Sequence, residues 1–361
     1  MKSLSILSED KQECIFAVML KDIRQLSLSE LTAWFKQEGE QAFRAKQVYA
    51  WLWQKSATDF DDMTNLSLAL REKLKAHFEI RPVNVHKEQF SNDGTIKSAF
   101  RLHDNHLVEG VMIPVEDRAT ACVSSQVGCS LTCKFCATGF MKRERNLEPA
   151  EIYDQVVLIR NQAEKSLGRP LTNIVFMGMG EPLLNYANVI KAIEKITSPE
   201  GLGMSPKRIT LSTAGIAKMI RKLGDDGVRF NLALSLHAAN DEKRDTIMPI
   251  NEQNNIEVLV EALNYFHEKT GNKITFEYIL LNGVNDTIQD AREIVELCQR
   301  VPAKVNILEY NKVEGASFSR TDAQRRDAFV TFLEKKGVTA SIRKSRGKDI
   351  DAACGQLANK G

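Results

Sequence analysis

The sequence predicts an α/β protein built on a partial barrel of six strand–helix units, with a small helical domain and a β-hairpin before it. Apolar residues follow a helical period from Ile23 to about Arg81, then alternate with a period of two over residues 82–120. From Ala119 onward, strand-like and amphipathic helical runs alternate, an order typical of parallel sheets with right-handed crossovers. We therefore expect four segments: a helical accessory domain (1–81), a β-hairpin linker (82–118), the partial barrel (119–345) and a C-terminal segment (346–361).

The N-terminal domain is expected to hold three or four helices, after residues 1–20, which carry little signal. Ser27 and Ser29 are candidate N-caps for the first helix, and Glu30 supports them. Its tryptophans fit a core, and its basic residues fit either a solvated face or contacts to RNA. These residues are Trp34, Trp51 and Trp53, and Arg44, Lys46 and Lys55.

The turn signal Asn92-Asp93-Gly94 predicts the hairpin, with strands near Lys97–Leu102 and Leu107–Pro114. The barrel strands are expected at Ala121–Gln126, Asn173–Met177, Arg208–Ser212, Asn231–Leu236, Ile274–Leu280 and Lys304–Tyr310. The helices between and after them are expected at Ala150–Lys165, Val189–Ile196, Ile216–Leu223, Ile256–His267 and Ile288–Val301.

The composition is that of an ordinary globular protein of 361 residues, 43% apolar and 27% charged, with a net charge of +2. No apolar run is long enough to span a bilayer, so we expect no membrane association and a cytoplasmic location. Seven cysteines, an odd number, argue against a secreted disulfide framework. Nothing in the sequence requires more than a monomer.

Three cysteines stand close together, Cys129, Cys133 and Cys136, in a C-x3-C-x2-C spacing. Three thiolates can bind three irons of a [4Fe–4S] cluster and leave the fourth iron open to a small chelating ligand. A structural zinc site normally needs a fourth ligand, often from a second C-x2-C pair, which this chain lacks. Plain core thiols are the other alternative. The spacing is the signature of the radical S-adenosylmethionine (SAM) enzymes, which this segment resembles.

Polar residues also follow several predicted strands, at the edge where α/β barrels build their sites. The motif G-M-G-E-P comes after the second strand, and its glycines would let the backbone approach a ligand, while Glu181 could pair with an ammonium group. Taken singly, this motif could be only a tight turn, and His237 only a hydrogen-bonded histidine. The candidate residues are Gly180, Glu181, Ser212, Ser235, Leu236, His237 and Asn311.

Six motifs occur in an order that resembles one family. They are V-E-G-V-M-I-P (108–114), C-V-S-S-Q-V-G-C (122–129), G-M-G-E-P-L-L-N (178–185), S-L-H-A-A (235–239), M-P-I-N (248–251) and D-I-D-A-A-C-G-Q-L (349–357). Together they resemble the radical SAM adenine-C2 RNA methyltransferases called RlmN, which act on 23S rRNA and tRNA. The resemblance runs from about residue 23 to 357.

The resemblance implies a role for each candidate residue. Cys129, Cys133 and Cys136 would bind the cluster, and the seven residues at the strand ends would hold SAM. Cys354 would be methylated by one SAM, and a second SAM, cleaved at the cluster, would yield a radical that activates this methyl group. The methylene would add to C2 of the adenine, Glu109 would take the C2 proton, and Cys122 would attack Cys354, form a disulfide and release the product.

The implied targets are adenine 2503 of 23S rRNA and adenine 37 of tRNAs, and the implied electron donor is a flavodoxin or ferredoxin. A radical suits this chemistry because C2 of adenine is electron-poor and its C–H bond is not acidic. Considered without the resemblance, Cys354 and Cys122 could be buried apolar thiols and Glu109 a solvated strand residue. Cys14 and Cys298 have no motif around them, and we expect Cys298 to be core.

Three alternatives remain at this stage. The related adenine-C8 methyltransferases of the antibiotic-resistance type share the cluster and the cysteine pair, although Pro182 and the C-G-Q-L tail fit the C2 enzymes better. A cluster-bearing RNA-binding or redox-sensing protein would not need the SAM residues. A radical SAM enzyme acting on a small molecule would leave the helical domain unexplained. Basic residues near the cluster and near Cys354 could grip phosphate or simply be solvated: Arg143, Arg145, Arg343, Lys344, Arg346 and Lys348.

Overall fold

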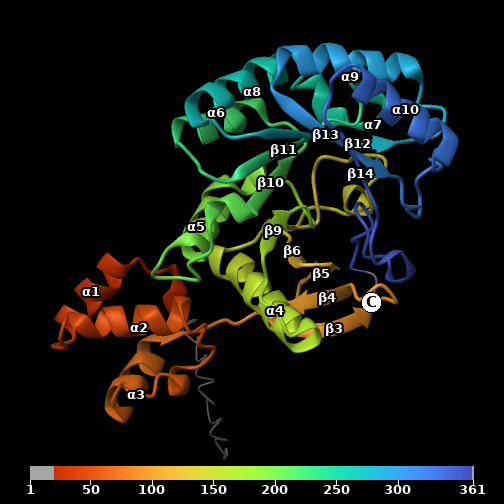
Figure 1. Ribbon diagram of the computed structural model, residues 1–361. Coiled ribbons are helices and arrows are strands. Elements are labelled where there is room, and N and C mark those ends of the chain that lie inside the picture. The colour runs from red at the N-terminus through yellow and green to blue at the C-terminus, as the bar shows by residue number, and fades with distance from the viewer. Residues whose placement is uncertain (1–19, 360–361) are drawn as a thin grey trace, which may run out of the picture. The chain divides into compact units, whose positions relative to one another are not determined.

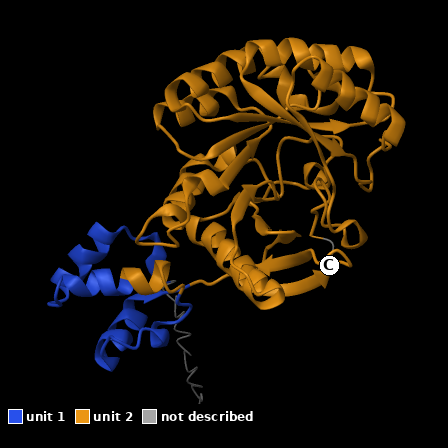
Figure 2. Ribbon diagram, viewed as in Figure 1, with its two compact units in different colours: residues 1–48, 57–80 blue, residues 49–56, 81–361 orange. Residues whose placement is uncertain are grey.

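The computed structural model describes residues 20–359, so Cys14 and nearly all of residues 1–20 lie outside the described part of the chain. The contacts divide the chain into two compact units (Figure 2). The first comprises residues 1–48 and 57–80, and the second comprises residues 49–56 and 81–361. The last turns of helix α2 (Phe43–Trp53) therefore belong to the second unit.

The first unit is helical, as the sequence predicts. It contains α1 (Leu28–Gln37), the start of α2 and α3 (Leu68–His77), and a short parallel pair of β1 (Lys21–Asp22) and β2 (Phe78–Glu79). Its core is made of buried apolar side chains from all three helices, among them Leu31, Phe35, Val48 and Leu74.

The predicted start of the first helix is confirmed. Ser27 is the N-cap of α1, and the Glu30 N–H donates to its Oγ over 3.2 Å. The Ser27 N–H donates in return to the Glu30 carboxylate over 2.7 Å, which completes a capping box. Of the three tryptophans, Trp53 is buried against the edge of the Tyr153 ring, and Trp34 and Trp51 are half-buried.

The second unit is built on one sheet of ten strands (Figure 1). Seven neighbouring strands are parallel: β6 (Arg118–Cys122), β9 (Asn173–Phe176), β10 (Ile209–Thr213), β11 (Asn231–Ser235), β12 (Ile274–Leu280), β13 (Ala303–Glu309) and β14 (Ala340–Arg343). Three antiparallel strands extend the sheet beside β6: β5 (Leu107–Val115), β4 (Ile96–Arg101) and β3 (Asn84–Phe90). The Gly94 turn, at a φ of +82°, joins β3 to β4 as predicted.

The helices of the second unit follow the strands in the predicted alternation. They are α4 (Pro149–Leu167), α5 (Tyr186–Thr197), α6 (Ala217–Asp225), α7 (Asp241–Ile247), α8 (Ile256–Thr270), α9 (Ile288–Arg300) and α10 (Ala323–Lys335). Short 3-10 helices lie at Ile23–Gln25, Phe60–Asp62, Ala137–Phe140, Pro182–Asn185, Pro206–Arg208, Pro249–Glu252 and Lys348–Ile350. Figure 1 shows α8 and α9 along one side of strands β11 to β13.

The two faces of the parallel strands differ in chemistry. Leu234 and Phe276 pack with Leu259 and Leu263 of α8, so their face of the sheet is covered by helices. Since successive side chains in a strand point to opposite faces, Ser235 and Glu277 lie on the inner face, which carries the candidate site.

The predicted fold class is confirmed. The pattern did not reveal several elements, among them α7, α10 and the seventh parallel strand, β14. The first barrel strand also ends at Cys122 and not at Gln126, because the chain then leaves the sheet before the short strand β7 (Gln126–Val127).

Candidate active site

The three clustered cysteines lie on one loop that is closed at its base. Strand β7 pairs antiparallel with β8 (Arg145–Asn146), which brings together the two ends of the loop from Gly128 to Glu144. Inside the loop, the Cys136 N–H donates to the Cys133 carbonyl over 3.2 Å and the Gly139 N–H donates to the Cys136 carbonyl over 2.9 Å. The loop therefore has a defined backbone that presents all three thiols.

The same three thiols pack against one apolar cluster that includes Leu131, Phe135 and Met248. Burial raises the pKa of each thiol, that of Cys129 to about 11. The neighbouring Cys136 and Cys129 raise the pKa of Cys133 further. Thiols that are buried and mutually repulsive as thiolates favour an iron–sulfur cluster, since the positive irons replace the protons.

The donor set fits a cluster better than a single ion. Within residues 20–359, no three Cys, His, Asp or Glu side chains converge closely enough to hold one metal ion. Each thiolate of an iron–sulfur cluster binds a different iron, so these ligands stand further apart than ligands around one ion. The residues present therefore fit a cluster with three cysteine ligands.

Gly128 is expected to be essential for this loop. It has a φ of +72°, and a Cβ at this position would lie 2.0 Å from the Lys142 carbonyl oxygen. We expect Gly128→Ala to lose most of the iron and sulfide bound per chain after anaerobic reconstitution, while its helical content stays unchanged. Gly271→Ala is the matched control, because Gly271 has a φ of +66° and no atom within 4 Å of an added Cβ. Full iron content in Gly128→Ala would refute the expectation.

The Glu181 carboxylate is deeply buried and accepts hydrogen bonds from the backbone. It accepts the Ala214 N–H over 2.7 Å and the Leu183 N–H over 3.0 Å. Burial raises its pKa, although these hydrogen bonds oppose the rise. Gly180 has a φ of +92°, and a Cβ there would meet the Gln126 side chain at 2.5 Å. Packing against Gln126 therefore requires a glycine at this position.

The remaining strand-end residues meet at the carboxyl edge of β10 and β11. The Ser212 and Ser235 hydroxyl oxygens lie 3.4 Å apart. The His237 side chain is buried, and its backbone adopts the left-handed conformation, at a φ of +55°. Its Nδ1 accepts the Ile279 N–H over 3.1 Å. Burial, and then the Arg244 charge, lower the pKa of His237 to about 3, so the ring is neutral and its Nε2 carries the proton. Leu236, which lies between Ser235 and His237 in the chain, is buried.

The C-terminal segment brings Cys354 to this edge. The Ala137 N–H, beside Cys136, donates to the Gly355 carbonyl over 2.7 Å, and Thr138 Oγ donates to the Leu357 carbonyl over 2.6 Å. From the end of β13, Asn311 Nδ2 donates to the Cys354 carbonyl over 3.4 Å. The segment therefore lies across the end of β13 and the loop from Gly128 to Glu144, which we call the cluster loop.

The Cys354 side chain is reachable by solvent although protein surrounds it. The surrounding protein, and then the Glu277 carboxylate, raise its pKa to about 11. Cys122 is buried at the end of β6. Burial raises the pKa of Cys122, and the nearby Cys354 raises it further, so the two sulfurs lie within electrostatic range. Neither forms a disulfide here.

Glu109 on β5 is buried and not solvated. Its Oε2 accepts the Ala358 N–H over 2.8 Å, and its Oε1 lies 3.5 Å from Lys97 Nζ. Since Val111 pairs with Cys122 in the sheet, Glu109 and Cys122 share one face. The structure thus brings Glu109, Cys122, Cys354 and the cluster loop together around the C-terminal segment.

Three residues that lie near the site were not among the candidates predicted from the sequence. Arg244 is fully buried and donates to the carbonyls of Leu236 and Ala214 over 3.1 and 2.6 Å, which fixes the backbone around the strand ends. Glu277 lies on the inner face near Cys354. Lys97 contacts Glu109 and lies in the segment predicted from the sequence to be a β-hairpin linker. The M-P-I-N motif could have pointed to Arg244, because its last residue, Asn251, accepts a hydrogen bond from the Arg244 guanidinium over 2.6 Å.

The basic residues near the site are partly engaged within the chain. Arg145 forms an ion pair with Glu151 at 2.8 Å, and Lys348 one with Glu309 at 3.0 Å. Arg143, Arg343 and Lys344 are exposed, which leaves them better placed to meet phosphate.

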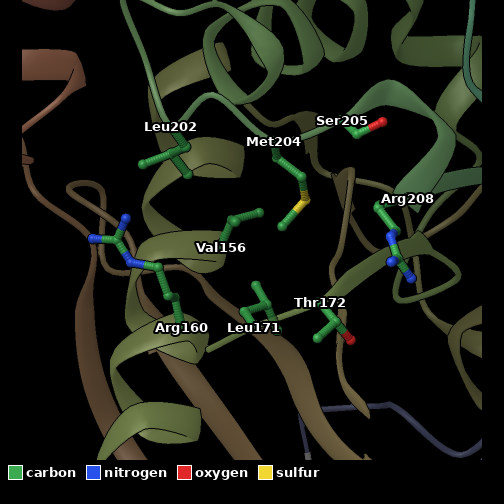
Figure 3. A pocket seen from close by; sticks show the side chains of 8 residues that line it. All are labelled: Val156, Arg160, Leu171, Thr172, Leu202, Met204, Ser205 and Arg208. Carbon is green, nitrogen blue, oxygen red and sulfur yellow. The ribbon is translucent and has the colours of Figure 1, made fainter. Parts of the chain in front are cut away.

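A separate pocket of about 370 Å³ lies at the opposite, amino edge of β9 and β10 (Figure 3). Its lining residues are Val156, Arg160, Leu171, Thr172, Leu202, Met204, Ser205 and Arg208, none of them a candidate site residue. None of the described helices is both long enough and apolar enough to cross a membrane.

Known proteins match this arrangement over most of the chain. A family model for the ribosomal RNA large subunit methyltransferase N-terminal domain matches residues 21–80, and one for the Radical SAM superfamily matches residues 123–298. A Cytophaga hutchinsonii protein named "Probable dual-specificity RNA methyltransferase RlmN" is 62% identical over 94% of this chain and 93% of its own length. A Geobacter sulfurreducens protein named "Dual-specificity RNA methyltransferase RlmN" is 45% identical over 94% of this chain and 92% of its own length.

A solved structure agrees with these matches. The crystal structure of a radical SAM methyltransferase from Sphaerobacter thermophilus superposes with a TM-score of 0.88 at 39% identity, and the match covers 93% of this chain and 99% of that one. The cofactors expected from the sequence, a [4Fe–4S] cluster and two molecules of SAM per turnover, follow from this family. The chain belongs to the RlmN family of dual-specificity RNA methyltransferases, which are radical SAM enzymes.

Proposed function

We propose that this enzyme methylates C2 of adenine in RNA by way of a methyl group carried on Cys354. The proposed targets are adenine 2503 of 23S rRNA and adenine 37 of tRNAs. The observation that carries the proposal is the position of Cys354, a solvent-accessible thiol held between the cluster loop, Asn311 and the Glu109 carboxylate, within electrostatic range of Cys122.

In this proposal Cys129, Cys133 and Cys136 hold the cluster, and the strand-end residues hold SAM. When bound, the cluster and SAM supply the one-electron chemistry that an electron-poor, non-acidic C2 position requires. Glu181, Ser212, Ser235 and Asn311 offer carboxylate, hydroxyl and amide groups for the polar parts of SAM. His237 and Leu236, both buried, would shape the edge against which SAM lies. Gly180 leaves room for the Gln126 side chain, whose Oε1 accepts the Glu181 N–H over 2.8 Å.

The chain's own residues then divide the remaining work. Cys354 carries the one-carbon group and becomes bonded to C2 through it. The Glu109 carboxylate takes the C2 proton as general base. The unpaired electron that radical addition leaves on the adduct would return to the cluster, so that the adduct is closed-shell before the next step. Cys122 attacks the Cys354 sulfur as a thiolate, an S–S bond forms, and the S–C bond breaks. The electron pair of the broken bond stays with the carbon, which takes up a proton and becomes the methyl group of the product.

RNA contact is assigned to the N-terminal helical domain and to exposed basic residues of the second unit. A target adenine inside folded RNA must be unstacked before C2 can be reached, so binding has to stabilise a distorted RNA. A flavodoxin- or ferredoxin-type electron donor remains a prediction from the family resemblance. A monomeric state and action in the cytoplasm remain predictions from the sequence.

Nucleoside analysis tests the position of methylation. The reconstituted enzyme is incubated anaerobically with SAM, a reductant and unmethylated 23S rRNA or tRNA, and the digested RNA is analysed by mass spectrometry against both methyladenosine standards. We expect 2-methyladenosine in both RNAs. An 8-methyladenosine product would overturn the C2 assignment, and methylation of only one RNA would overturn the dual targets.

A further inference from the structure

The buried pair of Lys97 and Glu109 links the hairpin strands to the segment that carries Cys354. Lys97 lies on β4 and Glu109 on β5, on the same face of the sheet, since Val111 is paired with Lys97 and Ala99 with Glu109. Both side chains are almost fully buried, and their charged atoms lie 3.5 Å apart. Lysine and glutamate are rarely buried to this extent unless they are paired.

The pair holds the catalytic segment on both sides of Cys354. Lys97 Nζ also donates to the Asp351 carbonyl over 3.4 Å, three residues before Cys354. Glu109 Oε2 accepts the Ala358 N–H over 2.8 Å, four residues after it. The backbone of Glu109 is itself fixed, because Ser124 Oγ donates to its carbonyl over 2.6 Å.

We infer that Lys97 is a positioning residue of the methyl transfer: its ammonium group orients the Glu109 carboxylate and holds the Cys354 segment in register with it. This inference rests on the proposed role of Glu109 as the base. Lys97 does not touch the reacting atoms. It balances the negative charge of a base that must lie away from bulk water, and it ties that base to the loop that delivers the one-carbon group.

A double-mutant cycle tests the inference. Lys97→Met should lower the rate of adenine methylation by about tenfold or more, in the range of general-base effects. Glu109→Gln should lower it further. The double variant should be no slower than Glu109→Gln alone, because an orienting group has no effect once the base is gone. Lys97→Arg, which keeps the positive charge, should recover part of the lost rate. Lys87→Met is the matched control, because Lys87 is exposed on the neighbouring strand β3.

Two further measurements separate positioning from folding. Methylation of Cys354 itself, measured by mass spectrometry of its peptide, should persist in Lys97→Met. Amide hydrogen exchange in the peptide covering residues 351–358 should become faster in Lys97→Met and stay unchanged in Lys87→Met. A normal rate in Lys97→Met, or a loss of rate that adds to that of Glu109→Gln, would overturn the inference.

The failure of the proposed function would look different. If Glu109→Gln retained the full rate, the proposed role of Glu109 would be wrong. If the unaltered enzyme never methylated Cys354, the proposed role of Cys354 would be wrong. Both results are independent of any variant of Lys97.

Discussion

Replacing Cys354 with alanine is expected to abolish adenine methylation, because the methyl group then has no attachment point on the protein. The side chain is exposed, so we expect the free energy of unfolding to change by less than about 0.5 kcal/mol. The measurement is the yield of methylated adenosine, together with the methyl content of the protein after incubation with SAM. Both should fall to background.

Cys298→Ala provides the control for this loss. Cys298 is a half-buried cysteine on α9, and burial raises the pKa of its thiol to about 11. It is not one of the candidate site residues. Its replacement should leave both methylation yields unchanged. A Cys354→Ala enzyme that still methylated RNA would show that the methyl group passes to adenine without this cysteine.

Replacing Cys122 with alanine is expected to trap the enzyme on its RNA. Without the second thiol, nothing attacks the Cys354 sulfur, so the bond from Cys354 to C2 of adenine should persist. The expected result is a covalent protein–RNA adduct that survives denaturing electrophoresis. After nuclease digestion, the Cys354 peptide should carry an adenosine linked through one carbon.

The double variant Cys122→Ala/Cys354→Ala should form no adduct, which distinguishes this linkage from a non-specific crosslink. Normal product release by Cys122→Ala would contradict the role of Cys122, and it would leave the role of Cys354 untouched.

Regular hydrophobic patterns made much of the fold predictable. The apolar-rich run that became β12, a strand buried along its whole length, was a strong signal. So were the amphipathic runs that became α4 and α8. The strand β14 was missed since it has only four residues, three of them exposed. Helix α7 was missed because its seven residues, largely charged, give little apolar period, and it is held instead by its Asn240 cap.

The sequence suggested the residues of the candidate site but could not show their arrangement. Spacing alone suggested that Cys129, Cys133 and Cys136 act together, because they are local in sequence. No local pattern could show that Ala358 would bond to Glu109, 249 residues away, or that Lys97 would balance its charge. Such contacts depend on how the hairpin joins the sheet and how the C-terminal segment crosses it. The packing of Gln126 against Gly180 was likewise invisible in the sequence, because only the fold brings these two residues together.

The measurement that tests the central claim most directly follows a labelled methyl group from Cys354 to RNA. The enzyme is first incubated with SAM that carries a trideuterated methyl group, then freed of SAM, and given RNA, reductant and unlabelled SAM for a single turnover. Our account predicts deuterium on the Cys354 peptide before RNA is added and in the methyl group of 2-methyladenosine afterwards. A first product whose methyl group holds no deuterium would contradict it, since the methyl group would then have come directly from the second SAM.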